Sequence, residues 1–293
     1  MPVHELRYRS WEGEVLPVPV RLLSVPRYTL MAVFNKYIAA VLLGIGVLQL
    51  IGYGGYLVIV TMPELQAMLE LPAEPVGLKD EQVFRYFYSV QYYICLLMVL
   101  LAAPRMISPE LAHRSIAIIF SRAIPRSGYI LGKVAALGGL LSLLTWVQTC
   151  ILFSLMYVLY PPDHTFHQQF WTESFPLLWK SLLLGITVTL LLTFVGLAGS
   201  AITKNARHAV VYLLIAFLGP GLATNMISNV FEVNVPAISL RHLTQDLGYL
   251  LFNPGEMLRD TGFVWITIAA LAWVALTFGI IFLQLRPHRV YRE

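Results

Sequence analysis

Charged residues are scarce in this sequence of 293 residues, and that scarcity excludes most soluble proteins. Asp, Glu, Lys and Arg together make up 12% of the chain, whereas hydrophobic residues make up 58%. An ordinary soluble domain has about 25% charged residues. Together with a mean hydropathy of +0.71, the composition predicts an integral membrane protein and argues against a disordered chain or a nucleic-acid-binding protein.

Cysteines are nearly absent, and this excludes a fold held together by disulfides. The two that occur, Cys95 and Cys150, both lie in apolar stretches, where we expect them to be buried as small hydrophobic residues. His164 and His167 lie in a short polar connection that offers no visible means of fixing a metal ion. We therefore expect no metal site, no catalytic residue and no cofactor in this chain.

Long apolar runs are abundant by contrast, and they recur along the whole chain. A spanning helix needs about 20 mostly apolar residues. Six stretches qualify, at 37–62, 84–103, 129–160, 177–202, 209–228 and 263–285. None of them contains an acidic residue, so we expect no ion pair buried within the spans. The predicted fold is an all-α membrane protein with six transmembrane helices.

The distribution of Lys and Arg predicts the orientation of the chain. If the N-terminus is cytoplasmic, most of the 20 Lys and Arg fall in the cytoplasmic segments, and only Lys79, Arg241 and Arg259 fall in the outer loops. Both termini are therefore expected in the cytoplasm. We divide the chain into a cytoplasmic N-terminal segment (1–36), a six-span transmembrane domain (37–285) and a cytoplasmic tail (286–293), in the inner (cytoplasmic) membrane of a cell.

Three shorter features accompany the spans. Residues 26–36 form an amphipathic pattern, so we expect a surface helix leading into the first span. The last outer loop, 229–262, repeats leucine at helical spacing from Leu240 to Leu250, which predicts one or two short helices there. Gly219, Pro220 and Gly221 lie together in the fifth span and predict a break or kink.

The inner connection between the second and third spans carries the most informative pattern. Ser108 suits the N-cap of a helix, Pro109 its first position, and Glu110 the positive end of the helix dipole. Pro125 ends the pattern, so we expect one short helix from Ser108 to Arg122. Such a helix is suited to receive force from a soluble partner, and equally to lie on the membrane as an ordinary amphipathic connector.

A wider set of residues around this helix matches a family signature. The matching positions are Ile107, Ser108, Pro109, Glu110, Ser121, Arg122, Arg126, Tyr129, Gly132 and Lys133. They resemble the signature of the type 2 ABC transporter permeases, which runs approximately Ile-Ser-Pro-Glu, a helix, then Ser-Arg-Pro-x-x-Arg-x-x-Tyr-x-x-Gly-Lys. Ala123 replaces the proline of that pattern, and Pro125 follows instead. The six-span layout with cytoplasmic ends is also similar to that family.

The resemblance implies that this chain is a non-catalytic permease subunit of an ABC exporter. It implies a second permease subunit, identical or homologous, within the lipid bilayer, and two cytoplasmic ATPase subunits that bind ATP and Mg. The Gly132-Lys133 pair does not form a phosphate loop, because Val134 occupies the position that needs Ser or Thr. The implied ATPase-coupling interface comprises Ser108, Pro109, Glu110, His113, Arg114, Arg122 and Arg126.

Polar residues within the spans are few and uncharged. Some of them are candidates to line a translocation path, although most such groups only form hydrogen bonds between helices. The candidates are Gln91, Thr145, Gln148, Thr189 and Thr193. Two other functions remain open: an ATP-independent carrier, which would transport without an ATPase, and a membrane anchor, which would bind a peripheral complex without nucleotide dependence.

Overall fold

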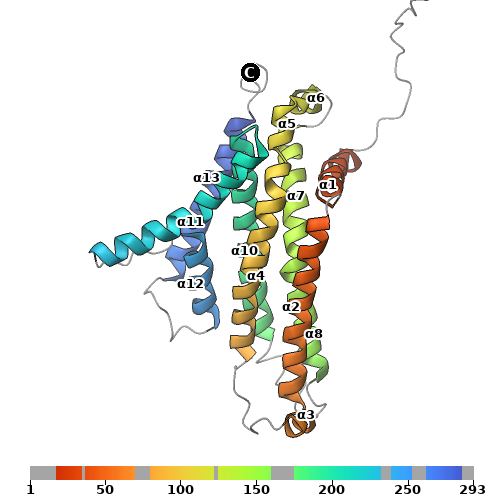
Figure 1. The fold of residues 1–293 in the computed structure, drawn as a ribbon, viewed down its shortest axis with the longest axis vertical. Coiled ribbons are helices and arrows are strands. Elements are labelled where there is room, and N and C mark those ends of the chain that lie inside the picture. The colour runs from red at the N-terminus through yellow and green to blue at the C-terminus, as the bar shows by residue number, and fades with distance from the viewer. Residues whose placement is uncertain are drawn as a thin grey trace, which may run out of the picture.

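The computed structural model describes residues 18–34, 37–69, 80–121, 125–159, 175–231, 239–252 and 262–285. These residues form helices joined by short turns, and no strand occurs among them. Six helical stretches are long and apolar enough to cross a membrane (Figure 1). The prediction of an all-α, multi-pass membrane architecture with six spans is thereby confirmed.

The six spans coincide closely with the apolar runs of the sequence. They are Ala39–Ile59, Val83–Ala112, Arg126–Leu159, Phe175–Ile202, Ala206–Ile227 and Phe263–Gln284. The helices that build them are α2 (Tyr37–Thr61), α4 (Asp80–Ala102), α7 (Arg126–Leu144), α8 (Trp146–Leu159), α10 (Phe175–Ile202), α11 (Ala206–Phe231) and α13 (Phe263–Gln284). In Figure 1, α2 begins and α13 ends at the same end of the bundle.

The second span is longer than predicted. After α4 the chain continues through a short 3-10 helix, η1 (Ala103–Arg105), and then through α5 (Ser108–Ala112). The whole stretch Val83–Ala112 counts as one span, so Glu110 belongs to the end of a span. The six predicted stretches themselves contain no acidic residue, but the expectation that no buried ion pair involves the spans is wrong, since the buried Lys133 of the third span pairs with Glu110.

The third span is interrupted near its middle. Thr145 separates α7 from α8, although its backbone N–H still donates to the carbonyl of Leu141 at 3.0 Å. The interruption divides a span that is too long for a single straight crossing. Cys150 on α8 is exposed at the surface of the bundle, whereas Cys95 on α4 is fully buried. The expected burial holds for Cys95 and fails for Cys150, because α8 lies at the edge of the bundle (Figure 1).

The helix α10 lies at the centre of the molecule. It contacts α4, α7, α8, α11, α12 and α13, and two thirds of its apolar window, 67%, is buried inside the chain. The corresponding share is only 17% for α11 and for α13. The spans containing α4, α7 with α8, and α10 therefore form the core, and α2, α11 and α13 pack around it.

Small residues allow this close packing. A Cβ atom on Gly196 of α10 would lie 2.7 Å from Cγ1 of Val99 on α4, and one on Gly199 would lie 2.5 Å from a methyl group of Leu213 on α11. On α2, a Cβ on Gly46 would lie 2.5 Å from a methyl group of Leu144. At Gly196 a larger side chain would collide with the short Val99, whereas at Gly46 and Gly199 it would require a leucine side chain to move.

The helix α1 (Val18–Phe34) precedes the first span and packs against α7. It begins eight residues before the predicted amphipathic segment and includes Pro26 in its interior. A Cβ on Gly132 of α7 would lie 2.7 Å from Cβ of Val25, so glycine lets α1 cross α7 at close range. Residues 35 and 36 and the predicted cytoplasmic tail, 286–293, lie outside the described residues.

The helix α11 continues through Pro220, so the break that the sequence allowed is absent and the kink stays a prediction. Proline removes one backbone donor, and a long helix tolerates that single loss where neighbours cover the site. A Cβ on Gly221 would lie 3.3 Å from Oγ of Ser239, which places the start of α12 (Leu240–Phe252) against this turn. Figure 1 shows the C-terminal part of α11 leaning away from the bundle.

The remaining helices lie at opposite ends of the bundle. At one end are α5 and α6 (Ser115–Ser121), and at the other is α3 (Pro63–Met68) (Figure 1). We refer to these as the α5/α6 end and the α3 end. The helix α12 lies toward the α3 end and packs against α4, α10, α11 and α13. A helix was predicted in this part of the chain, and the structure confirms it.

Candidate functional site

The connection between the second and third spans is fixed to α10 by a serine pair. Oγ of Ser200 accepts hydrogen bonds from the backbone N–H groups of Ile107 and Ser108, both at 3.1 Å. Oγ of Ser108 donates to the carbonyl of Ser200 at 2.7 Å. All three residues are buried. The start of α5 is therefore attached to the end of α10 by three hydrogen bonds within the protein interior.

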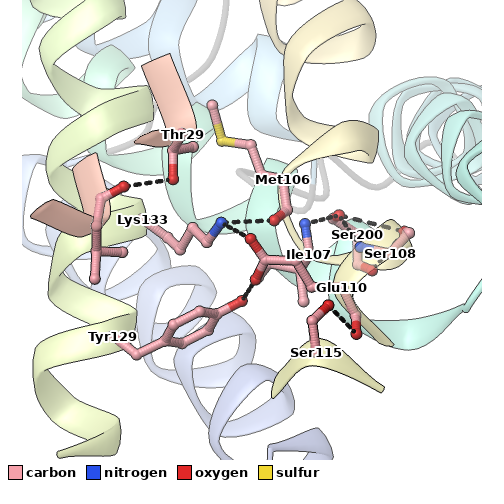
Figure 2. Close-up of polar contacts among 10 residues, drawn as sticks. Thr29, Met106, Ile107, Ser108, Glu110, Ser115, Tyr129, Lys133 and Ser200 are labelled. Atoms are coloured by element: carbon pink, nitrogen blue, oxygen red, sulfur yellow. Dashed lines mark hydrogen bonds and ion pairs between the residues drawn. The ribbon is translucent and has the colours of Figure 1, made fainter. Parts of the chain in front are cut away.

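This contact corrects the role predicted for Ser108. The residue that precedes α5 is Ile107, and no side chain forms a cap hydrogen bond there. Ser108 is the first helical residue, and its hydroxyl is directed to Ser200 because α10 lies directly beside it (Figure 2). Capping of the first N–H groups is supplied by Ser200, a residue distant in sequence, in place of the local serine.

The carboxylate of Glu110 is bound by two side chains of α7. Nζ of Lys133 lies 2.5 Å from Oε1 of Glu110, and the hydroxyl of Tyr129 donates to Oε2. Lys133 also donates to the carbonyl of Met106 at 2.8 Å. Figure 2 shows Lys133 and Tyr129 both pointing toward Glu110. Since Lys133 is only 3% exposed and the side chain of Glu110 27%, this ion pair is largely shielded from solvent.

The predicted single helix is divided into α5 and α6 by a turn at His113 and Arg114. Arg114 has a φ of 54°, a left-handed conformation that non-glycine residues rarely adopt. Its N–H donates to the carbonyl of Leu111, and Oγ of Ser115 donates to the carbonyl of Glu110. In a continuous helix the carbonyl of Glu110 would accept from the backbone N–H of Arg114. The hydroxyl of Ser115 occupies this carbonyl instead, which explains why α5 ends here.

The tip of this connection is exposed and carries basic side chains. His113 and Arg114 are exposed, and Pro109 is half-buried. Arg126, at the start of α7, lies over the ring of Phe120 on α6, with its guanidinium carbon 6.0 Å from the ring centroid. Phe120 in turn packs edge-on against Tyr129. Arg122 of the predicted interface lies outside the described residues.

The coupling residues named from the sequence therefore fall into two groups. Ser108 and Glu110 face the interior and fix α5 to α10 and α7. His113 and Arg114 are exposed at the turn between α5 and α6. The arrangement joins α5 to three spans at once: by covalent continuity to α4, by the ion pair to α7 and by the serine contact to α10. Displacement of α5 would consequently move all three.

The candidates for a translocation path lie inside the chain. All five are buried: Gln91, Thr145, Gln148, Thr189 and Thr193. The hydroxyls of Thr145 and Thr189 form a hydrogen bond of 3.0 Å between α7 and α10. When the side-chain amide of Gln148 is oriented with its nitrogen toward α2, that nitrogen donates to the carbonyls of Leu144 and Gly46. In this conformation Thr145, Thr189 and Gln148 hold helices together, and a role of the five residues in transport stays a prediction.

Two features of this site were not found from the sequence. Ser200 was not singled out, although it lies in a stretch rich in small residues, 196–201, that is typical of close helix contact. The pairing of Glu110 with Lys133 and Tyr129 was also missed, because 19 and 23 residues separate the partners. Among the described residues, no group of His, Cys, Asp and Glu could hold a metal ion. His164 and His167 lie outside them.

No family model matches this chain, and no curated protein matches it. The likeness of residues 107–133 to the type 2 ABC permease signature therefore depends on those residues alone. Four of them, Ser108, Glu110, Tyr129 and Lys133, contribute directly to the polar contacts that fix α5.

Proposed function

We propose that this protein is the permease subunit of an ABC exporter and transmits ATP-driven motion from a separate ATPase through α5 and α6. The observation that carries the proposal is the Glu110 ion pair, with Lys133 on one side and Tyr129 on the other. A carboxylate held by two side chains of the next span makes α5 rigid relative to α7. Rigidity is what a helix needs in order to convey force.

The orientation of the bundle in the membrane supports the same proposal. The first span begins at the α5/α6 end and the last span finishes there (Figure 1). We place this end in the cytoplasm, because Arg105, Arg114, Arg126, Lys204 and Arg207 all lie at the span ends or in the connections at that end. Both termini are then cytoplasmic, and α5 and α6 face the compartment that contains ATP.

Partner subunits complete the proposed assembly. Two ATPase chains would bind ATP and Mg and dock on the exposed tip formed by His113 and Arg114. A second permease subunit, identical or homologous, would close the translocation path. The outward-facing surface of α2 offers room for it, since a Cβ on Gly44, Gly52 or Gly55 would meet no atom within 4 Å. Catalysis takes place in the ATPase and not in this chain.

The test is copurification of the tagged, full-length protein from its native host in mild detergent, followed by mass spectrometry and an ATPase assay. We expect a stoichiometric ATPase. A charge-reversed tip, H113E/R114E, should reduce the recovered ATPase at least tenfold. The matched control is R207E, which changes an exposed arginine in the first turn of α11 at the same end and should leave recovery unchanged.

The alternatives predict different outcomes of the same experiment. A preparation without ATPase that still transports would identify an ATP-independent carrier. A stable partner without ATPase activity would identify a membrane anchor. Equal recovery of the ATPase from the wild type and from H113E/R114E would contradict the docking site, provided that both proteins insert and elute identically.

A further inference from the structure

Three glutamine side chains lie where α2 packs against α4 and α8. Gln49 is at the middle of α2, Gln91 is on α4 and Gln148 is on α8. Gln91 is 0% exposed and Gln148 4%, and Gln49 is half-buried. An amide inside a membrane span has no bulk water to bond, so each of the three needs hydrogen-bond partners within the bundle.

The amide of Gln49 is only partly satisfied. Its Nε2 donates to the backbone carbonyl of Phe87 on α4 at 3.0 Å, which ties α2 to α4. Its Oε1 is buried and has no hydrogen-bond partner among the described residues. Gln148 differs, because its amide nitrogen bonds the carbonyls of Leu144 and Gly46. Gln49 therefore presents an unused acceptor at the interface between α2 and α4.

The amide of Gln91 is enclosed without adequate partners. Neither its Nε2 nor its Oε1 has a nitrogen or oxygen partner within the described part of the chain. The group that this amide does reach is the thiol of Cys95, one turn further along α4, which is a weak hydrogen-bonding partner. A buried amide left in this condition destabilises the fold. Gln91 therefore requires a ligand that the neighbouring side chains do not supply.

The unused groups of Gln49 and Gln91 lie close to each other. Phe87, whose carbonyl binds Gln49, is one turn before Gln91 on α4, and side chains of a helix point back toward the preceding turn. A second contact agrees: a Cβ on Gly46, three residues before Gln49 on the same face of α2, would lie 3.9 Å from Nε2 of Gln91. A donor and an acceptor thus meet between α2 and α4 without bonding each other directly.

We propose that a buried water molecule binds between α2 and α4, where it accepts a hydrogen bond from Nε2 of Gln91 and donates one to Oε1 of Gln49. Water suits this site because it is small, donates and accepts at once, and carries no charge. An ion would meet only neutral amides there, without an opposite charge. The first span is then joined to α4 by an exchangeable molecule as well as by direct contacts.

The test is X-ray radiolysis of the full-length protein in mild detergent and isotopically labelled water, followed by mass spectrometry of its peptides. Radicals formed from a bound water oxidise the nearest reactive side chain, and sulfur-containing side chains are readily oxidised. Cys95 lies beside Gln91, whereas Met98, equally 0% exposed, is about 10 Å from Gln91 along α4. We expect Cys95 to take up at least fivefold more labelled oxygen than Met98.

A variant and a matched control assign the labelling to Gln91. Q91L removes the donor at similar volume and should reduce the labelling of Cys95 to that of Met98. Q245L makes the same substitution at an exposed glutamine on α12 and should leave both labels unchanged. Equal labelling of Cys95 and Met98 in the wild type would overturn the proposal without any variant having to fold. Unchanged labelling of Cys95 in Q91L would also overturn it.

Thermal unfolding in the same detergent tests the bridge independently. A shared water couples Gln49 to Gln91, because loss of either residue leaves the other unpaired. Q91L should lower the unfolding temperature, and Q49L/Q91L should lower it by less than the sum of the two single variants. A higher unfolding temperature for Q91L, or strictly additive losses, would contradict a shared ligand. Because no ATPase takes part, failure here leaves the proposed permease function standing, and the reverse also holds.

Discussion

At the scale of single residues, the carboxylate of Glu110 determines where α5 lies. It is the acceptor for Lys133 and Tyr129, and Lys133 also reaches the carbonyl of Met106. Once paired in this way, a buried lysine is stable only as long as its carboxylate remains. Glu110 is therefore a positioning residue of the proposed interface, and the exposed His113 and Arg114 are its contact surface.

A double-mutant cycle on Glu110 and Lys133 measures this contact. Removal of one partner from a buried pair typically costs about 3–5 kcal/mol. We expect the lower end of that range for E110Q, because the Glu110 side chain is 27% exposed. The double variant E110Q/K133M should lose less than the sum of the single variants. Thermal unfolding in detergent is the measurement, and strictly additive losses would show that the two residues do not interact.

Arg114 provides a second residue-scale prediction, which concerns its left-handed backbone. An L-residue in that conformation costs about 1–2 kcal/mol, a cost that glycine avoids. R114G and R114A both remove the charge, so the difference between their unfolding temperatures reports the cost of the left-handed backbone conformation. We expect R114G to unfold at the higher temperature of the two. A higher unfolding temperature for R114A would argue against the left-handed turn between α5 and α6.

Which side chains contact one another was the feature of the structure that the sequence predicted least well. The motif residues Glu110, Tyr129 and Lys133 were all named from the sequence, yet nothing in it stated that they bind one another. Their partnership depends on the crossing of α5 and α7, which is a property of the packed bundle. Ser200 was missed for the same reason, since its function depends on which helix end lies beside it.

At the scale of helices, the spans were predictable and their irregularities were not. Apolar runs of about 20 residues are imposed by the bilayer, so all six spans were evident from hydropathy. Proline and glycine predicted either a break or a kink in α11, and the helix continues through Pro220 without a break. The chain instead turns at Arg114, where the sequence shows neither residue, because Ser115 competes for a helix carbonyl.

The central position of α10 leads to a prediction about glycine. A Cβ on Gly196 would approach Val99, Ala103 and Leu137 at 2.7, 3.1 and 3.3 Å, so G196A should destabilise by about 1–3 kcal/mol through overpacking. On α7, a Cβ on Gly139 would meet nothing within 4 Å. G139A should therefore stabilise by roughly 0.5–1 kcal/mol through helix propensity.

Unfolding of both variants in the same detergent checks this contrast. Stabilisation by G196A would mean that α10 is less tightly enclosed than the structure shows. The pair is well matched, because each change adds one methyl group to a glycine within a spanning helix.

At the scale of the whole molecule, the proposed orientation makes a labelling prediction. The exposed His113 lies at the α5/α6 end and the exposed Glu64, on α3, at the other. In a background without Cys95 and Cys150, E64C should react with a membrane-impermeant maleimide on intact cells. H113C should react only after the membrane is permeabilised. The reverse pattern would place the proposed coupling connection outside the cell and contradict the permease function.

The position of α10 also has a consequence for how the protein is made. Synthesis proceeds from the N-terminus, so α2, α4, α7 and α8 enter the bilayer before Ile202, the last residue of α10, has left the ribosome. Until then the surfaces of Val99 and Leu137 that will enclose Gly196 face lipid or the insertion machinery. A nascent chain halted before α10 has the contacts of α2 with α4 and of α7 with α8, but it lacks the helix that contacts α4, α7 and α8 in common.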